Sequence, residues 1–306
     1  MFAATLLLLA CSSQGPTVTP QAPPPTPPIV RFAALGDVGQ GNEAQAQVAQ
    51  ALAQVCTQRA CDFVLLLGDN LYPAGLDSPA DARMNAVFSD MYASVDAPFY
   101  VTLGNHDYGH PWDGVRAQHQ VDWATSVDKF YLPSKSYETT VGTAHLWSLD
   151  TTAILKDGAE AQNKWLTGSI AKATEHWKIA FGHHPYRSNG PHGNAGNYDA
   201  RPGAGSSLQN LIEERLCPTV DLYISGHDHN LQWLQRCDMG LIVSGSGAAV
   251  YPLVHHDNQP LFATSQLGFS LIELLPNEYR VTFFDEQAQV LFTQSRHKRP
   301  APAPSP

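Results

Sequence analysis

Basic side chains, long apolar runs and internal repeats are all scarce in this sequence of 306 residues. Lys and Arg together number 18, against 28 Asp and Glu, which gives a formal net charge of −10. Binding to nucleic acid or to anionic membranes in general relies on a basic surface, so this composition argues against both kinds of partner. No apolar run approaches the roughly 20 residues that a membrane-spanning helix needs. The 43% of hydrophobic residues suffices for a large buried core.

The two ends of the chain differ in composition from the middle. Residues 1–11 are apolar and end in Leu8-Leu9-Ala10-Cys11, which resembles a bacterial lipoprotein signal whose Cys becomes lipidated. The absence of Lys or Arg before the apolar run departs from that pattern, and an ordinary signal peptide or a disordered tail is the alternative. Residues 12–28 are Pro-rich and uncharged, which predicts a tether. Residues 296–306 are basic and then Pro-Ala-rich, which predicts a disordered tail.

These features predict a single globular domain over residues 29–295 in an exported protein. We expect a periplasmic or cell-surface lipoprotein, monomeric, whose only membrane contact is the lipid at Cys11. Beyond Cys11 there are four further cysteines, and an even number in an exported chain favours disulfides. Four cysteines allow three pairings, which the sequence does not decide, and buried free thiols are the alternative. We favour Cys56 with Cys61 across a helix-to-strand corner and Cys217 with Cys237 around residues 221–230.

The hydrophobic pattern predicts a layered α/β domain of the α+β type. Its first third alternates apolar strands with helices, over strands 30–35, 63–67 and 98–103 and helices 42–56 and within 77–95. Residues 111–135 are irregular and aromatic-rich. A hairpin over 137–150, helices over 159–174 and 208–216, and strands over 178–181 and up to His227 follow, with a long Gly- and Asn-rich loop over 187–206. Strands at 241–244, 269–274, 279–284 and 290–293 are expected to complete a second, more antiparallel sheet.

Residue types that can bind metal ions follow the ends of these strands. They are Asp37, Asp69 with Tyr72, Asn105 with His106, His183, and His227 with His229. Each motif alone is weak, because Gly-Asp often marks a turn and His-x-His is more often a surface pair. Their joint occurrence is informative, because the carboxyl ends of strands form the edge of an open α/β sheet where ligands bind. Oxygen and imidazole donors suit iron, zinc or manganese, so the sequence predicts a two-metal site in which Asp69 bridges the ions.

The same motifs carry a family resemblance over roughly residues 30 to 250. Gly36-Asp37, Gly68-Asp69-Asn70-Leu71-Tyr72, Gly104-Asn105-His106-Asp107, Gly182-His183 and Gly226-His227-Asp228-His229 resemble the metallophosphoesterase (calcineurin-like) superfamily. The Tyr three residues after the second Asp is similar to the purple acid phosphatases within it, and the size resembles their short, mammalian-type members. The resemblance implies a four-layer αββα sandwich of two mixed sheets, with a dimetal site at the carboxyl ends of the strands.

The resemblance also implies a role for each residue of the site. The first metal would bind Asp37, Asp69, Tyr72 and His229, and the second Asp69, Asn105, His183 and His227. His184 directly follows the proposed ligand His183 and is the alternative at that position. His106 and His192 match histidines that contact phosphate and assist the leaving group, although the match around His192 is loose. A phenol has a pKa near 10 and loses its proton at neutral pH only when its oxygen binds a strong Lewis acid, which favours ferric iron at the first site.

The function that follows is hydrolysis of phosphate monoesters, of the acid phosphatase type. A hydroxide bound to the metals would attack phosphorus, with a divalent iron, zinc or manganese ion at the second site, and His192 would protonate the leaving group. A phosphodiesterase or nucleotide-processing relative is the alternative, followed by a non-catalytic metal- or phosphate-binding surface protein. The remaining histidines fit no motif, except that His255 and His256 could lie at the rim. Trp112, Trp123, Tyr186 and Tyr198 could line a substrate groove or pack locally.

Overall fold

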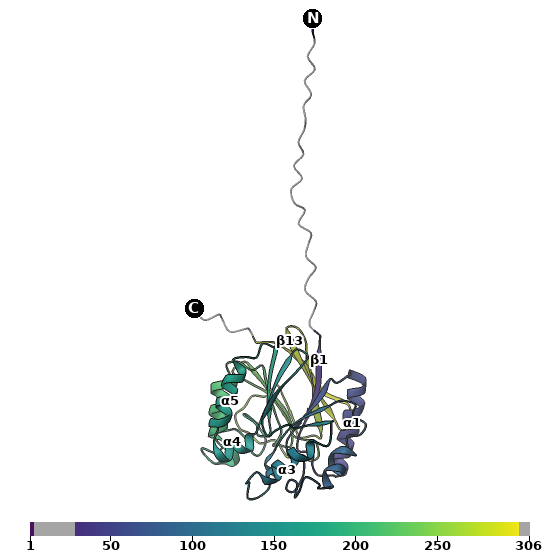
Figure 1. Ribbon diagram of the computed structural model, residues 1–306, viewed down its shortest axis with the longest axis vertical. Helices are drawn as coiled ribbons and strands as arrows, with labels where there is room; N and C mark the ends of the chain where they lie inside the picture. Colours follow the sequence, from purple (N-terminus) through teal and green to yellow (C-terminus); the bar gives the residue numbers. More distant parts are fainter. Residues whose placement is uncertain (3–27, 300–306) are drawn as a thin grey trace.

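Parallel strands rich in Val, Leu and Phe form the centre of two facing sheets. The computed structural model describes residues 1–2 and 28–299, so the predicted signal segment with Cys11 and nearly all of the tether lie outside the described residues. Each sheet has seven strands. Figure 1 shows α1 on one side of the sheets and α4 and α5 on the other. The predicted αββα sandwich of two mixed sheets is therefore confirmed.

The first sheet has the order β14-β13-β12-β1-β2-β3-β4. Its parallel strands are β1 (Val30–Leu35), β2 (Phe63–Leu67), β3 (Phe99–Thr102) and β4 (Phe130–Tyr131). The antiparallel strands β12 (Gly268–Leu274), β13 (Glu278–Asp285) and β14 (Val290–His297) extend it beyond β1. Their predicted place in the second sheet is wrong, because β12 pairs with β1 in the register Val30 to Leu274. Apolar alternation identifies a strand but not its distant partner.

The second sheet has the order β11-β9-β10-β8-β7-β6-β5. It comprises β5 (Tyr137–Val141), β6 (Ala144–Leu149), β7 (Trp177–Gly182), β8 (Leu222–Ser225), β9 (Leu231–Arg236), β10 (Met239–Ser244) and β11 (Phe262–Thr264). Strands β6, β7, β8 and β10 are parallel neighbours. The two blocks of parallel strands end at the same edge of the sandwich, which brings loops from both sheets together there.

The helices cover the outer faces. Asn42 caps the N-terminus of helix α1 (Glu43–Arg59), because its side chain accepts a hydrogen bond from the Gln45 amide. This is a typical N-cap. On the other face lie α4 (Thr151–Asp157), α5 (Glu160–Ile170) and α6 (Ser206–Leu211), which continues as the π-helix η3 (Ile212–Leu216). Short helical turns also occur at α2 (Asn105–Tyr108) and η2 (Tyr198–Ala200). Among the described helices, none is both long and apolar enough to cross a bilayer.

Two predictions about the segment between β2 and β5 need correction. Residues 111–135 are not irregular throughout, because they contain α3 (Val115–Ala124) and β4. The helix buries Gln120 beside Ala117 and Val121, and this buried polar residue weakens the apolar periodicity that identifies a helix. The helix expected within 77–95 is only a five-residue π-helix, η1 (Asn85–Ser89).

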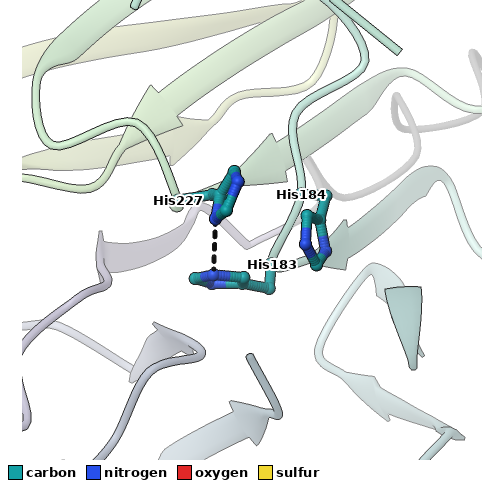
Figure 2. Close-up of side chains that lie close together, drawn as sticks. All are labelled: His183, His184 and His227. Atoms are coloured by element: carbon teal, nitrogen blue, oxygen red, sulfur yellow. Dashed lines mark hydrogen bonds between the residues drawn. The ribbon is translucent and has the colours of Figure 1, made fainter. Parts of the chain in front are cut away.

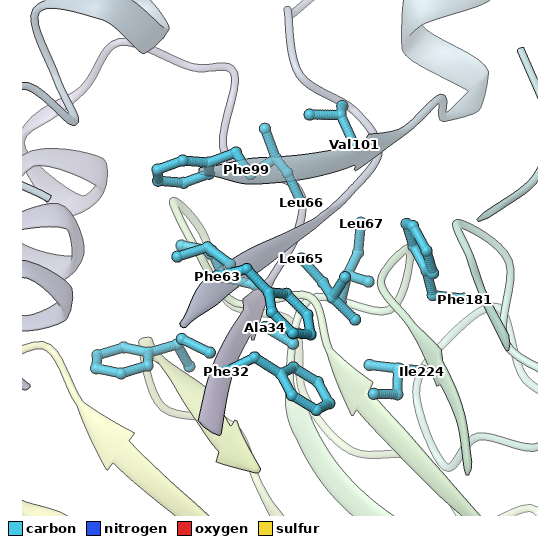
Figure 3. Packing of buried hydrophobic residues seen from close by; sticks show 14 of the residues in the cluster. Phe32, Ala34, Phe63, Leu65, Leu66, Leu67, Phe99, Val101, Phe181 and Ile224 are labelled. Carbon is cyan, nitrogen blue, oxygen red and sulfur yellow. The ribbon is translucent and has the colours of Figure 1, made fainter. Parts of the chain in front are cut away.

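Aromatic and branched side chains fill the space between the sheets. Phe32 and Phe63 stack with their ring centroids 4.7 Å apart, and Figure 3 shows them with Leu65, facing Phe181 and Ile224 of the second sheet. Burial of one such side chain contributes about 1.5–3 kcal/mol to stability. A second cluster, which includes Trp147, lies between the second sheet and helices α4 to α6. The strands that carry the candidate ligands are thus held on both faces.

Two disulfides link segments near the surface. Cys56 is bonded to Cys61 and Cys217 to Cys237, which confirms the favoured pairing. The first joins the last turns of α1 to the residues before β2, and the second joins the end of η3 to the turn between β9 and β10. At the other end of the chain, β14 runs to His297 and the Lys298 Nζ donates to Asp221 Oδ1 at 2.7 Å. The described structure therefore extends past residue 295, the end that the sequence predicts for the domain.

Candidate metal centre

All seven predicted ligands lie together at the carboxyl ends of parallel strands. Asp37 follows β1, Asp69 and Tyr72 follow β2, and Asn105 begins α2 just after β3. From the second sheet, His183 follows β7, and His227 and His229 follow β8. Residues up to about 190 positions apart in the chain thus meet at one edge, with the His227 amide donating to Asp37 Oδ2 at 2.8 Å.

The donor atoms form a first group around Tyr72. Its hydroxyl donates to Asp69 Oδ2 at 2.9 Å and lies 3.4 Å from Asp37 Oδ1. The same hydroxyl is 3.3 Å from His229 Nε2, and that nitrogen is 3.4 Å from Asp37 Oδ1. These are the four side chains expected at the first metal.

A second group forms around His183. Its Nε2 atom is 3.1 Å from Asn105 Oδ1, 3.1 Å from His227 Nδ1 and 3.4 Å from Asp69 Oδ2. Figure 2 shows the rings of His183 and His227 directed toward one another. The Oδ2 atom of Asp69 belongs to both groups, because it contacts both Tyr72 and His183.

The spacing of these donors fits two metal ions. Donors bound at roughly 2.0–2.2 Å to one ion in tetrahedral or octahedral geometry lie about 2.9–3.5 Å from each other. The distances within the two groups run from 2.9 to 3.4 Å. Donor chemistry agrees, because carboxylate, amide, phenol and imidazole suit borderline and hard cations. The residues present could therefore hold two ions that share Asp69.

The backbone at the ligands adopts conformations that side chains rarely favour. The φ angles of Asp37, Asp69 and His227 are 59°, 53° and 67°. Each such non-glycine residue costs about 1–3 kcal/mol, and residues of this kind cluster at functional sites. Close packing of the loops adds a requirement for glycine, since a Cβ on Gly104 would lie 2.1 Å from Asp69 Oδ1. The fold thus accepts local strain to place these side chains.

The neighbours of the two adjacent histidines distinguish His183 from His184. The Nδ1 atom of His183 lies 2.9 Å from the Leu67 carbonyl, so it donates there and leaves Nε2 free for a metal. His184 instead contacts Thr151 Oγ1 through Nδ1 at 2.8 Å, and its ring lies 4.4 Å from that of His227. The contacts of His183 Nε2 with Asp69 and Asn105 support His183 as the ligand.

Charge compensation among the ligands is visible in their pKa values. Burial acts to raise the pKa of Asp69, but the charge of His183 and then of His106 brings it well below its usual range. Burial acts to lower the pKa of His183, and Asp69 raises it to about 9. Burial, together with Asp69 and Asp37, raises the pKa of the Tyr72 phenol well above its ordinary value. Only a strong Lewis acid could convert Tyr72 to a phenolate here.

Asp107 connects the loops that carry the ligands. Its buried carboxylate accepts hydrogen bonds from the amides of Asn70 at 2.9 Å and Gly104 at 2.8 Å, and from Gln120 Nε2 at 3.0 Å. Burial, and then the nearby charge of Asp69, raise the pKa of Asp107 to about 7. This residue was part of the sequence motif but had no predicted role, and the structure places it behind the ligands as a support.

The two histidines expected to assist catalysis lie at the mouth of the site. His106 packs its ring on Tyr72, with centroids 4.4 Å apart, and its Nδ1 lies 2.7 Å from the Pro73 carbonyl. His192 packs on His227 at 4.1 Å, and its Nδ1 lies 2.7 Å from Asp199 Oδ1. Asp199 also forms a salt bridge with Arg201. Sequence analysis missed Asp199 and Arg201, although their position in the long polar loop was a signal.

The other residues singled out in the sequence divide between the site and the core. Trp112 and Tyr198 line a cavity beside His192, whereas Trp123 and Tyr186 are buried in the hydrophobic clusters. Tyr251, which sequence analysis missed, stacks on His229 with ring centroids 4.2 Å apart. At the rim, His256 contacts the Gly190 carbonyl and His255 is exposed. His145 lies away from the site between Glu138 and Glu175.

Comparison with known protein families assigns the chain to one of them. The family described as "Calcineurin-like phosphoesterase" matches residues 30–231, a span that contains every candidate ligand. The chain belongs to the calcineurin-like phosphoesterase family. Within characterised proteins, this calcineurin-like phosphoesterase is similar to tartrate-resistant acid phosphatase type 5 of Mus musculus, at 27% identity over 90% of this chain and 92% of the relative. It is also similar to purple acid phosphatase 3 of Arabidopsis thaliana, at 28% identity over 88% of this chain and 78% of the relative.

Solved structures show the same fold. GAP50, the anchor in the inner membrane complex of Plasmodium, matches with a TM-score of 0.73 and 24% identity, over 89% of this chain and 90% of its own. Purple acid phosphatase PPD1 from yellow lupin (Lupinus luteus) seeds matches with a TM-score of 0.69 and 14% identity, over 92% of this chain and 58% of its own. At these identities the likeness concerns the fold of this calcineurin-like phosphoesterase alone.

Proposed function

We propose that this chain is a dinuclear metal-dependent phosphatase that hydrolyses phosphate monoesters. The observation that carries the proposal is the sharing of Asp69 Oδ2 between two groups of donor atoms, at 2.9 Å from Tyr72 and 3.4 Å from His183. The similarity to tartrate-resistant and purple acid phosphatases over about nine tenths of the chain supports the same activity.

The ligand assignment follows the two groups. Asp37, Asp69, Tyr72 and His229 would hold ferric iron, and Asp69, Asn105, His183 and His227 would hold divalent iron, zinc or manganese. Two bound cations would make a water molecule nucleophilic and neutralise charge on the phosphate. Tyr72 supports iron at the first position. Burial and two carboxylates raise the pKa of its phenol, so only a strong Lewis acid such as ferric iron could bind it as a phenolate.

The chain's own residues would bind the phosphoryl group and move a proton. His106, above Tyr72 and half exposed, is placed to donate to a phosphate oxygen. His192 has Nδ1 held by Asp199 at 2.7 Å, which directs Nε2 toward the substrate. Water adds to phosphorus, the ester P–O bond breaks, and the leaving oxygen takes a proton from His192. The proton lost by the water restores His192, so no covalent phosphoenzyme is needed.

The compartment follows from the cysteines. Two disulfides are present among the described residues, and such bonds persist in oxidising environments. We therefore place the enzyme outside the cytosol, where its substrates would be organic phosphate esters. Attachment through a lipid at Cys11 remains a prediction from the sequence.

The test is turnover by the full chain loaded with iron and zinc. We expect hydrolysis of phenyl phosphate at a rate at least ~100-fold above that of bis(phenyl) phosphate, with release of inorganic phosphate. A preference for the diester would instead support the phosphodiesterase reading. Absence of turnover on both esters, with both metals bound, would overturn the proposal in favour of a non-catalytic metal- or phosphate-binding protein.

A further inference from the structure

A second cavity adjoins the candidate metal centre on the far side of His192. The first cavity, of about 300 Å³, is lined by Tyr72, His106 and other residues of the site. The second has a volume of about 410 Å³ and shares Asn105, His192 and His227 with the first. The two cavities therefore adjoin, with His192 at the boundary. We call the second space the Trp112 cavity.

The walls of the Trp112 cavity have an apolar, aromatic side and a polar side. Trp112, Leu155, Tyr198, Ala204 and Gly205 form the first, and His184, Asp199 and Arg201 join the three shared residues in the second. Tyr198 is 3% exposed, and its hydroxyl donates to the Pro185 carbonyl, so its polar atom is already satisfied. A ligand that entered this space would meet rings and aliphatic carbon on the Trp112 side, and hydrogen-bonding groups only on the side of His192, Asp199 and Arg201.

The loop that carries Trp112 holds it in an unusual conformation. Trp112 has a φ of 61°, which is a genuine outlier for a bulky side chain. The loop is fixed on both sides, because the Trp112 amide donates to the Gly109 carbonyl at 2.8 Å and Lys135 Nζ donates to the Gly114 carbonyl at 2.9 Å. Backbone strain of this kind persists where the surrounding structure imposes it, often at ligand-binding positions. A half-buried indole on a cavity wall is a natural stacking surface.

We propose that the Trp112 cavity binds the leaving group of the substrate, and that this group is a planar aromatic alcohol. The inference rests on the proposed phosphatase function, because it places the ester oxygen beside His192 at the boundary between the two cavities. The volume falls within the range of small-molecule sites and admits one ring system. A polyol in the same space would find no replacement for its hydrogen bonds to water along the side formed by Trp112, Leu155, Tyr198 and Ala204, which disfavours sugar phosphates.

Arg201 extends this specificity at the rim of the cavity. Its side chain is 72% exposed and shares Asp199 with His192 through one end of the guanidinium. A guanidinium carries five N–H donors, so this contact leaves donors for a second partner. The aryl group favoured by the cavity is therefore one with an anionic substituent distal to the ester, which would approach Arg201.

The experiment compares two monoesters on the metal-loaded full chain, as the ratio of kcat/KM for 4-carboxyphenyl phosphate to that for glycerol 2-phosphate. In Trp112→Ala we expect this ratio to fall about tenfold, mainly through KM for the aryl ester, because the stacking surface is lost. Trp112→Phe should restore most of the ratio.

A second ratio tests Arg201. Arg201→Gln should lower the ratio of kcat/KM for 4-carboxyphenyl phosphate to that for phenyl phosphate by about threefold. Val115→Ala, on an exposed residue at the start of α3, is the control and should change neither ratio.

A binding measurement keeps the two proposals separable. Calorimetry on the metal-loaded wild type should show phenylphosphonate binding about tenfold more tightly than methylphosphonate, whether or not the protein turns over. Equal binding of the two phosphonates, or an equal loss for both substrates in Trp112→Ala, would overturn the aromatic subsite while leaving the phosphatase proposal intact. Absence of turnover combined with selective binding of phenylphosphonate would overturn the phosphatase and retain the cavity.

Discussion

The floor of the candidate site and its rim are built in different ways. The floor consists of the seven candidate ligands, and Asp37, Asp69 and His183 there are 0%, 2% and 0% exposed. They follow strands of two sheets that are packed on both faces. The rim lies on loops and on the short helical turns α2 and η2, and it consists of His106, Trp112, His192, Asp199, Arg201 and Tyr251. The side chains of His106 and His192 are 39% and 32% exposed.

The floor and the rim of the site therefore have different tasks. A rigid floor fixes the spacing of donors, which a pair of ions needs to within a few tenths of an ångström. A rim on loops contacts the part of the substrate that varies from one ester to another. Substitutions in the floor should therefore act through metal binding, whereas substitutions in the rim should change rates and selectivity and leave the metals in place.

The largest effect is expected for Asp69→Ala. Asp69 Oδ2 belongs to both donor groups, so its loss should leave fewer than two ions bound and lower turnover by about 10⁴-fold or more. Metal content by mass spectrometry and hydrolysis of phenyl phosphate measure the two effects. The matched control is Asp128→Ala, an exposed acid between α3 and β4, which should behave as wild type. A fully metal-loaded, active Asp69→Ala protein would contradict the shared-ligand arrangement.

Tyr72→Phe should have a more selective effect on the floor. A ferric phenolate absorbs visible light, so the iron-loaded wild type should be purple or violet and the variant should lose this band. The second group of donors, around His183, does not include Tyr72, and its ion should remain bound in the variant. A colourless wild type that contains both metals would show that Tyr72 does not bind ferric iron, and the diesterase reading would gain support.

Asp199→Asn tests the rim with a smaller expected effect. Asparagine keeps the size of the side chain but removes the charge that would stabilise protonated His192, so kcat should fall about 10–100-fold for esters with poor leaving groups. Esters with good leaving groups should be affected much less, and both metals should remain bound. In His192→Ala, the further change Asp199→Asn should have no additional effect. Equal loss for good and poor leaving groups would contradict a role through His192.

The smallest effect is expected away from both regions, at His145. This residue contacts Glu138 and Glu175 at 3.0 and 2.9 Å. Burial acts to raise the pKa of both carboxyls, but hydrogen bonds from Ser169 and His145 to Glu138, and from His145 to Glu175, leave both pKa values below 4.5. A lowered folded-state pKa stabilises the fold above the unfolded-state pKa, and this contribution is lost as the pH falls through the lowered value.

His145→Gln should therefore lower the free energy of unfolding by about 1 kcal/mol at pH 7, a modest value because Glu138 is partly exposed. Below about pH 4 the difference from wild type should shrink. Urea denaturation of the metal-free proteins at the two pH values measures it, with His255→Gln, an 81% exposed site, as the control. A difference that stays constant across this pH range would show that packing, rather than the two carboxylates, accounts for the loss.

The same contrast explains what the sequence could predict. Asp37, Asp69, Asn105, His183 and His227 were identifiable because each follows an apolar strand, and strand ends of one sandwich meet at one edge. The partner of β12 was not identifiable, because its alternating pattern fits the edge of either sheet. The sequence left open whether Trp112 lines a groove or packs locally, and it did not identify Asp199. Both lie in segments without periodicity, and only the three-dimensional path of these segments brings Asp199 to His192 and Trp112 to the cavity wall.

The pairing of β1 with β12 also determines when the protein can finish folding. The last candidate ligand, His229, is synthesised well before Gly268–Leu274, so a nascent chain already carries the complete ligand set while one edge of β1 is still bare. Unpaired edges of this kind attract other chains. A chain truncated before residue 268 would therefore hold every ligand and yet tend to aggregate, and ions that arrive before synthesis is complete would meet an unfinished sheet. We therefore expect both ions to be bound stably only after β12 has paired with β1.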